Sequence, residues 1–341
     1  MKKILFIIIG ILLLLIILFF WASHSPLKTG SSDIPTIDYG SGEEVVPTDN
    51  KLKVLTWNLA FAYGFGSEGN GYVPKSAAVL SERLNKIGEA IKDSGADIVL
   101  LQEIDFDSSR SHHVDQLAEL ARITGLRYGA KAVSWEANYV PFPYWPLSYN
   151  FGEINSGGAV LSRYPITKNT VTLYPKPESN PFYYNAFYLY RYTQQVGVKL
   201  RDKTLTIVNN HLEAYDKKTR EDQAKGLSGI AKNLKSDVII GGDMNTVPPE
   251  AKQKSGFPDE PDDYRDDNTL SILRVMPGMK EIIPAEDYHK NESQYFTFPS
   301  FAPNRRLDYI FVPESAKIDE AHPINAGTMS DHLPFFTSLE L

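Results

Sequence analysis

Cysteine is absent from this 341-residue sequence. The absence excludes catalysis by a thiol, stabilisation by disulfide bonds, and zinc or iron–sulfur sites that depend on cysteine ligands. It also excludes a lipoprotein anchor, because such an anchor is attached to a cysteine. Any metal ion in this protein must therefore be held by oxygen or imidazole ligands.

An excess of basic residues is lacking as well. Lysine and arginine together number 35, against 42 aspartate and glutamate residues, so the formal net charge is −7. Neutralising a nucleic-acid backbone requires clustered lysine and arginine, so this balance argues against a protein that holds nucleic acid mainly through a broad basic surface. A compact site that cleaves nucleic acid is still compatible with it.

Charged residues are also missing from a long apolar segment near the N-terminus, residues 4–22. At about 1.5 Å rise per residue, a helix of this length crosses a hydrocarbon core of roughly 30 Å. Lys2 and Lys3 favour a cytoplasmic N-terminus, and Trp21 lies where an interfacial aromatic residue is expected. We predict a transmembrane anchor over residues 1–23, with the rest of the chain on the periplasmic or extracellular side.

A cleaved signal peptide is the alternative for this segment, with Ser23-His24-Ser25 as a weak cleavage site. The apolar part of a signal peptide usually has only about 7–15 residues, so the length favours a retained anchor. Residues 24–50 are rich in Ser, Gly, Pro, Thr and acidic residues without apolar periodicity, which predicts a flexible linker. The remainder, residues 51–341, suits one large globular domain.

The domain begins with a predicted strand–helix–strand unit. Residues 52–59 alternate and favour a strand, and a Gly-rich loop separates them from a helical pattern that ends at Gly95. The apolar residues of that helix recur at steps of three and four: Leu80, Leu84, Ile87 and Ile91. Residues 97–101 then form an apolar run typical of a strand covered on both faces, and the run ends at Gln102 and Glu103.

A second unit repeats this design. Residues 204–209 predict a strand, Leu227, Ile230 and Leu234 mark a helix, and residues 238–240 predict a second buried strand. In layered α/β proteins, ligands bind outside the carboxyl ends of the strands. The strand ends of the two units carry these polar residues: Asn58, Glu103, His211, and Asp243 with Asn245.

Carboxylates at the ends of buried strands need an explanation. Burying an unpaired carboxylate costs several kcal/mol unless a cation or hydrogen-bond donors meet it. A shared metal site would explain both Glu103 and Asp243. The alternative is that each residue only marks the point where its strand reaches solvent.

Several short motifs follow one another in a fixed order along the chain. They are Thr56-Trp57-Asn58, Leu101-Gln102-Glu103, the segment 156–166 (SGGAVLSRYPI), Asn210-His211-Leu212, Gly242-Asp243-Met244-Asn245, Arg306-Leu307-Asp308-Tyr309 and Ser330-Asp331-His332. Through these motifs the chain resembles the endonuclease/exonuclease/phosphatase (DNase I-like) superfamily from about Leu52 to the C-terminus. The resemblance implies an α/β (α+β) four-layer sandwich, in which two packed, mainly antiparallel β-sheets are flanked by helices and preceded here by one transmembrane helix.

The metal ligands are expected among oxygen donors. Glu103 and Asn58 suit Mg²⁺, or alternatively Mn²⁺, with waters and a substrate phosphate completing the coordination. The resemblance places Asp331 beside the metal or at a second, weaker metal position. The expected chemistry is attack of water in line on phosphorus, with the metal ion and histidines stabilising the charge on the phosphoryl oxygens.

The remaining site residues are expected to align the attacking water and to contact the phosphate. Asp243 and Asn245 would point to one face of an extended segment, one aligning the attacking water and the other contacting the phosphate. His332 would donate to a phosphoryl oxygen while Asp308, as the resemblance implies, fixes its tautomer. His211 would contact the phosphate or assist the leaving group.

A structural role is the alternative for either His211 or His332 taken alone, and it is the one we expect for the other histidines. These include His112, His113, His289 and His322.

Two aromatic-rich segments, 135–151 and 174–192, bear on the substrate. Their rings either pack on one another to stiffen loops, lie in a lipid headgroup layer, or stack on unpaired bases. We predict a Mg²⁺-dependent phosphoesterase acting on a phosphodiester or phosphomonoester outside the membrane, with lipid headgroups favoured because they are the nearest abundant phosphodiesters. An extracytoplasmic nuclease acting on DNA or RNA, or a phosphate-binding domain without activity, are the alternatives.

Overall fold

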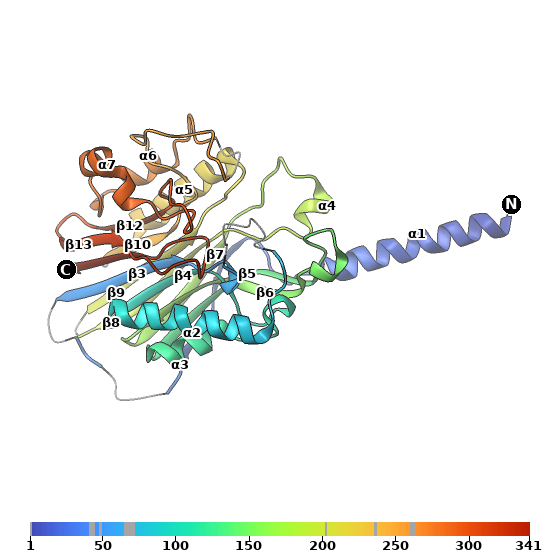
Figure 1. Cartoon of the computed structure of the whole chain (residues 1–341), viewed down its shortest axis with the longest axis horizontal. Helices are drawn as coiled ribbons and strands as arrows, with labels where there is room; N and C mark the ends of the chain where they lie inside the picture. The colour runs from blue at the N-terminus through green and yellow to red at the C-terminus, as the bar shows by residue number, and fades with distance from the viewer. Residues whose placement is uncertain are drawn as a thin grey trace.

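The computed structural model describes residues 2–40, 45–47, 50–64, 72–201, 203–234, 237–259 and 263–341. The Gly-rich loop predicted after the first strand lies largely outside these residues. Among them, two seven-stranded sheets pack face to face, and helices cover their outer faces (Figure 1).

The first sheet contains the first predicted unit. Its strands in spatial order are β13 (Lys317–Pro323), β14 (Phe335–Glu340), β3 (Lys51–Asn58), β4 (Ile98–Asp105), β6 (Gly152–Ser162), β5 (Tyr128–Val140) and β2 (Thr36–Asp38). Strands β3 and β4 run parallel, with Val54 opposite Ile98, and the other neighbours run antiparallel.

The second sheet contains the second unit. Its strands in order are β1 (Gly30–Asp33), β7 (Ile166–Leu173), β8 (Tyr192–Leu200), β9 (Lys203–His211), β10 (Val238–Asp243), β12 (Asp308–Pro313) and β11 (Met279–Glu281). Strands β9 and β10 are again a parallel pair within an otherwise antiparallel sheet. The prediction of two mainly antiparallel sheets is confirmed.

Helices form the two outer layers. On the first sheet lie α2 (Ala77–Ser94) and α3 (Gln116–Thr124), and near the second lie α4 (Phe182–Asn185), α5 (Lys217–Asn233), α6 (Thr269–Arg274) and α7 (Ala285–Asn291). The apolar stripe of α2 is buried against β3 and β4, as its spacing predicts. The Ser76 hydroxyl accepts a hydrogen bond from the Val79 amide at the start of α2, and Gly95, with φ +66°, ends it.

The central core lies between the sheets. Leu100 and Val160 of the first sheet pack there with Ile207, Ile239 and Ile310 of the second, and all five are fully buried. This explains the continuous apolar runs in β4 and β10, because each central strand faces the other sheet on one side and a helix layer on the other. The strand ends of the two sheets are thereby held in fixed register around one edge of the sandwich.

The structure differs from the expected linker over residues 24–50. Within it, β1 pairs with the edge strand β7, Gly30 lying opposite Leu173, and β2 pairs with β5, Ile37 lying opposite Gly129. An edge strand offers unpaired backbone groups to any extended segment, so these short strands form without apolar alternation. A sequence pattern based on side chains does not reveal such pairing.

The N-terminal segment forms α1 (Lys2–Ala22), which projects away from the sandwich (Figure 1). Its mean hydropathy of 3.4 and its 21 residues are sufficient to cross a membrane, and a signal sequence has the same properties. The end of α1 contacts the domain, because the Asn138 side-chain amide donates a hydrogen bond to the Trp21 carbonyl (2.8 Å).

Candidate active site

The predicted site residues converge on one edge of the sandwich and come from both sheets. They are Asn58 at the end of β3, Glu103 in β4, His211 at the end of β9, Asp243 at the end of β10, Asp308 at the start of β12, and Asn245, Asp331 and His332 in loops. All of them except Asp308 line one cavity of about 670 Å³. Residues up to 274 positions apart in sequence therefore face a shared space.

Asp243 lies at the centre of this arrangement and is almost fully buried. Its Oδ2 accepts a hydrogen bond from the Asn58 side-chain amide (3.0 Å), which crosses from one sheet to the other. The same oxygen lies 3.6 Å from Nε2 of both His211 and His332. Burial raises the pKa of Asp243, with the charge of His332 opposing the shift. A buried carboxylate of this kind is suited to accept a proton.

His332 is held between two carboxylates. Its Nδ1 donates a hydrogen bond to Oδ2 of Asp308 (2.8 Å), so Nε2 faces Asp243. Burial opposes the charged ring, but Asp308 and Asp243 together raise the pKa of His332 above its ordinary value. The imidazole is therefore protonated at neutral pH and can donate a hydrogen bond from Nε2.

Glu103 owes its direction to an irregularity of β4. The pairing of β4 with β6 shifts between Leu101 and Ile104, and Glu103 has a φ of +49°. Such a bulge re-aims a side chain and costs backbone energy, which points to a functional constraint. The preceding residue, Gln102, is buried and donates a hydrogen bond to Asn209 of the opposite sheet (2.7 Å). Glu103 therefore faces the cavity while Gln102 joins the two sheets beneath it.

Two carboxylates, Glu103 and Asp331, lie close together in the cavity. Glu103 accepts a hydrogen bond from Asn58 Nδ2 (3.2 Å), and its side chain is 26% exposed. Burial, assisted by Glu103, raises the pKa of Asp331, whose Oδ1 accepts a hydrogen bond from Ser330 (3.1 Å). Neighbouring hard oxygen donors of this kind fit a divalent cation such as Mg²⁺ or Mn²⁺.

Asn58 contributes to this site in a way that the sequence did not indicate. Its Nδ2 faces Glu103 and Asp243, while its Oδ1 accepts a hydrogen bond from the Ala60 amide (3.1 Å). Direct metal ligation by Oδ1 would require the amide group to turn over. In the arrangement described, Asn58 positions the carboxylates.

The potential metal-ligand atoms of Asp243, Asp308 and His332 also lie within 4.8 Å of one another. Because His332 is protonated between the two carboxylates, this cluster is better described as a hydrogen-bonded relay than as a metal site. The metal-binding chemistry fits the neighbouring carboxylates Glu103 and Asp331, and Asn58 Nδ2 joins Glu103 to Asp243.

Asn245 differs from its predicted geometry. It follows β10 with a φ of +49°, so it does not continue an extended segment with Asp243. Its backbone amide donates to Oδ1 of Asp243 (2.9 Å), and its side-chain amide donates to the Leu212 carbonyl (2.9 Å). The prediction that both side chains share a strand face is wrong, because the chain turns immediately after Asp243. Asn245 orients Asp243 and ties it to the loop after His211.

His211 interacts with a residue that the sequence reasoning missed. Nε2 of the buried His211 accepts a hydrogen bond from the guanidinium group of Arg191. Burial, together with the charges of Arg191 and His332, places the pKa of His211 well below its ordinary value. His211 is therefore neutral, in contrast to the protonated His332.

Arg191 is itself fixed by buried partners. It lies 3.5 Å from Glu213, and the Tyr188 hydroxyl donates to the same carboxylate (2.7 Å). No spacing rule connects these three residues to the motifs, because Arg191 precedes β8 and meets the site only through sheet pairing.

The side chains of His112, His113, His289 and His322 are exposed.

The fold and the site define a phosphoesterase, a hydrolase in which carboxylates and histidines line one cavity. The pattern of the Endonuclease/Exonuclease/phosphatase family matches residues 55–332. The chain belongs to this family, as its motifs predict. No curated protein matches the chain in sequence.

Solved structures show the same fold at low sequence identity. An endonuclease/exonuclease/phosphatase from Beutenbergia cavernae is similar with a TM-score of 0.61 and 21% identity, over 86% of this chain and 72% of that one. One from Bacteroides vulgatus has a TM-score of 0.55 and 15% identity, over 85% and 99%. D. rerio TDP2, in complex with a single-strand DNA product, has a TM-score of 0.57 and 15% identity, over 86% and 100%.

Proposed function

We propose that this protein is a Mg²⁺-dependent phosphodiesterase that acts on the outer side of a membrane, with membrane phospholipids as its substrate class. The observation that carries the proposal is the convergence of Asp243, His332 and Glu103 on one cavity. An apolar helix, α1, adjoins the same domain, which makes lipid headgroups the nearest abundant phosphodiesters. The positions of Lys2 and Lys3 at the N-terminal end of α1 support an outward-facing domain.

The reaction is hydrolysis by in-line attack of water on phosphorus. Asp243 accepts the proton that the attacking water loses, as the bond between phosphorus and the leaving oxygen breaks. His332 donates its Nε2 proton in a hydrogen bond to a phosphoryl oxygen, and Asp308 maintains the tautomer that makes this possible. His211, held by Arg191, lines the same cavity as Asp243 and would contact the phosphate near its leaving oxygen, which takes its proton from solvent.

Glu103 and Asp331 would hold the divalent cation, and Asn58 would position Glu103 through its side-chain hydrogen bond. When bound, such a cation withdraws charge from phosphoryl oxygens as a Lewis acid. The relay residues Asp243 and His332 line the same cavity as Glu103 and Asp331, so both groups can contact one phosphate.

The experiment is a substrate panel measured with the full chain in detergent micelles. The panel contains phosphatidylcholine, sphingomyelin, single- and double-stranded DNA, RNA, inositol phosphates and the soluble diester bis(4-nitrophenyl) phosphate. We expect hydrolysis with Mg²⁺ that stops on addition of EDTA and returns with excess Mg²⁺. Activity that survives EDTA would contradict the proposed chemistry.

A nuclease is the second candidate. It is favoured by the structural likeness to D. rerio TDP2, which was solved with a single-strand DNA product, and by aromatic side chains beside the site that are able to stack on bases. The net charge of −7 weighs against it. Preferential cleavage of nucleic acid over every lipid in the panel would decide for this candidate. A phosphate-binding domain without activity is disfavoured, because Glu103, Asp243 and His332 are all present.

A further inference from the structure

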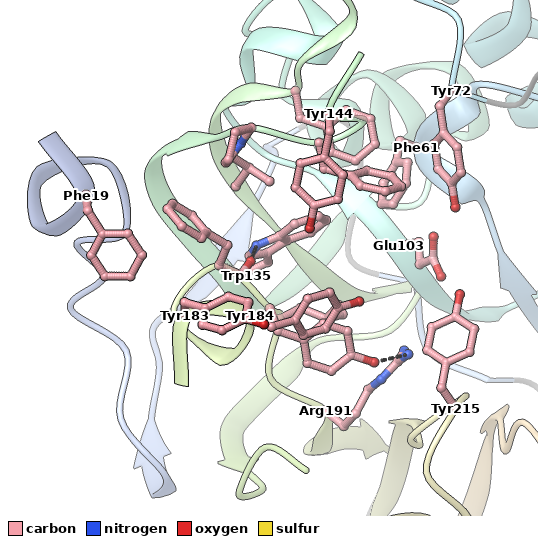
Figure 2. A pocket seen from close by; sticks show the side chains of 17 residues that line it. Phe19, Phe61, Tyr72, Glu103, Trp135, Tyr144, Tyr183, Tyr184, Arg191 and Tyr215 are labelled. Atoms are coloured by element: carbon pink, nitrogen blue, oxygen red, sulfur yellow. Dashed lines mark hydrogen bonds between the residues drawn. The ribbon is translucent and has the colours of Figure 1, made fainter. Parts of the chain in front are cut away.

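A second cavity, of about 390 Å³, adjoins the catalytic one (Figure 2). The two cavities share five lining residues, Phe61, Tyr72, Glu103, Arg191 and Tyr215. In Figure 2, Glu103, Arg191 and Tyr215 lie together at one end of this second cavity. A ligand that occupies this second cavity therefore reaches Glu103 of the catalytic site directly.

The walls of this cavity are aromatic and come from the two aromatic-rich segments. Phe142 and Phe151 pack edge to face with ring centroids 5.5 Å apart, and Trp135 packs on Phe151 at 6.0 Å. The Trp135 indole N–H donates to the Phe187 carbonyl (2.9 Å), which joins the two segments. The rings therefore stiffen each other, as one of the three explanations predicted, and they also enclose a preformed apolar space.

The far end of the cavity is closed by the membrane helix. Phe19 of α1 lines it and packs edge to face on Phe187 at 5.4 Å and on Phe182 at 6.3 Å. Figure 2 shows Phe19 at the end opposite Glu103. The cavity thus runs from an apolar end at α1 to a charged end at the catalytic site.

Exposed apolar side chains lie at this end of the domain and in the loop that contains Tyr144, which lines the cavity. Trp145 and Phe182 are each 78% exposed, and Leu147 is 65% exposed. A helix that spans the bilayer places its last turn at the headgroup layer, where aromatic side chains are favoured. Phe182 contacts the last turn of α1 through Phe19, so a bilayer spanned by α1 would have its surface beside this side chain.

We propose that the aromatic cavity takes the apolar chain of a membrane phospholipid and that the end of α1 forms part of this binding site. The proposal rests on the proposed function, because it places the lipid phosphate at Glu103 and Asp243. Among the residues that line the cavity, Glu103 and Arg191 carry charge, and both lie where it joins the catalytic site. An amphipathic lipid matches a cavity that is apolar at one end and charged at the other. A nucleic acid would also require cationic contacts for its backbone along the cavity.

The experiment is photolabelling of the full chain in phosphatidylcholine nanodiscs. The probes are phosphatidylcholine and phosphatidylglycerol with a diazirine on the acyl chain, and EDTA is present to prevent turnover. We expect adducts on peptides that contain Trp135, Tyr144 and Phe187, in addition to those on α1. Adducts from both probes confined to α1 would overturn the proposal.

A variant pair on α1 separates a specific contact from general membrane proximity. We expect Phe19→Ala to lower labelling of the Trp135 peptide by about threefold or more, since it removes an apolar wall of the cavity. Phe6→Ala is the matched control, because Phe6 lies on the same helix, is 71% exposed and does not line the cavity. Tyr144→Ala, on the exposed rim, is a second test that does not disturb α1. Equal labelling of the Trp135 peptide in Phe19→Ala, Tyr144→Ala and the control Phe6→Ala would overturn the proposal.

Turnover of bis(4-nitrophenyl) phosphate with Mg²⁺, measured in the same preparations, distinguishes failure of the lipid-binding proposal from failure of the proposed function. Turnover without labelling of the cavity would overturn the lipid-binding proposal and leave the proposed function standing. Labelling of the cavity without turnover by the wild-type chain would overturn the proposed function and support lipid binding. Displacement of the label by an oligothymidylate, but not by added phospholipid, would assign the cavity to nucleic acid instead.

Discussion

The two histidines of the site have opposite protonation states, and their neighbours explain the difference. His332 lies between Asp308 and Asp243, which stabilise the imidazolium, whereas His211 accepts a hydrogen bond from Arg191 and is kept neutral. Groups whose pKa values are driven apart by their surroundings provide an acid and a base at one pH. At the scale of single residues, the charges around each ring therefore determine its role.

Loss of the central carboxylate or of the protonated ring should remove most of the activity. We expect Asp243→Asn and His332→Ala each to lower kcat by roughly 10²-fold or more, because each removes a proton-transfer or hydrogen-bonding group of the transition state. The measurement is steady-state hydrolysis of bis(4-nitrophenyl) phosphate with Mg²⁺. Near-wild-type kinetics in both variants would refute the assigned roles.

Replacement of Asp308 should change the pH dependence as well as the rate. The Asp308 carboxylate raises the pKa of His332, so in Asp308→Asn the ring loses its proton at lower pH. If the charged ring is required, the alkaline decline of kcat then begins at lower pH than in the wild type, with kcat reduced at neutral pH. Asp107→Asn is the matched control, because it breaks an exposed Asp–His pair with His113 (2.7 Å) outside the site. An unchanged alkaline limb in Asp308→Asn would contradict the relay.

At the scale of elements, close approach of the two sheets constrains the glycines of β6. A Cβ atom added to Gly158 would lie 1.7 Å from the hydroxyl of Tyr192, a buried residue of β8 in the opposite sheet. Tyr192 in turn contacts His211 edge to face at 6.4 Å. Gly158 therefore supports the site indirectly, through the spacing of the sheets.

Gly158→Ala should destabilise the domain by about 1–3 kcal/mol, the usual cost of overpacking a core. The measurement is thermal unfolding of the full chain in detergent. Gly229→Ala is the control, and the opposite change in stability is expected for it. This exposed position within α5 has nothing within 4 Å of an added Cβ atom. Alanine there should stabilise the protein by about 0.5–1 kcal/mol through helix propensity. Equal unfolding temperatures for the two variants would show that the sheets can move apart at β6.

The elements themselves were largely predictable because side-chain patterns specify them. The spacing of Leu80, Leu84, Ile87 and Ile91 predicted α2, and the apolar run at 238–240 predicted the start of β10. Strand order, β1 and β2, and the bulge at Glu103 were not predictable, because they depend on backbone pairing between distant segments. Arg191 was missed for the same reason, since only the pairing of β8 with β9 brings it to His211.

At the scale of the whole molecule, a cleaved signal peptide and a retained anchor would leave different side chains uncovered on the domain surface. Cleavage near Ser23 would remove Phe19 and so uncover Phe187 and the apolar end of the aromatic cavity. It would also remove the Trp21 carbonyl, to which Asn138 donates. Retention of α1 would keep these contacts, and an α1 that spans a membrane would hold the catalytic site at the bilayer surface.

We therefore expect the mature protein to retain α1 and to expose its domain outside the cytoplasm. Intact mass of protein extracted from membranes should include residues 1–23, and release should require detergent rather than high salt or alkaline carbonate. Protease added to intact spheroplasts should digest the domain, because Lys2 and Lys3 keep the N-terminus inside. The double variant Lys2→Glu with Lys3→Glu is the control for orientation and should reduce this digestion. A mature N-terminus near Ser25, with a domain released by salt alone, would contradict retention, and it would also deprive the aromatic cavity of the wall that Phe19 provides.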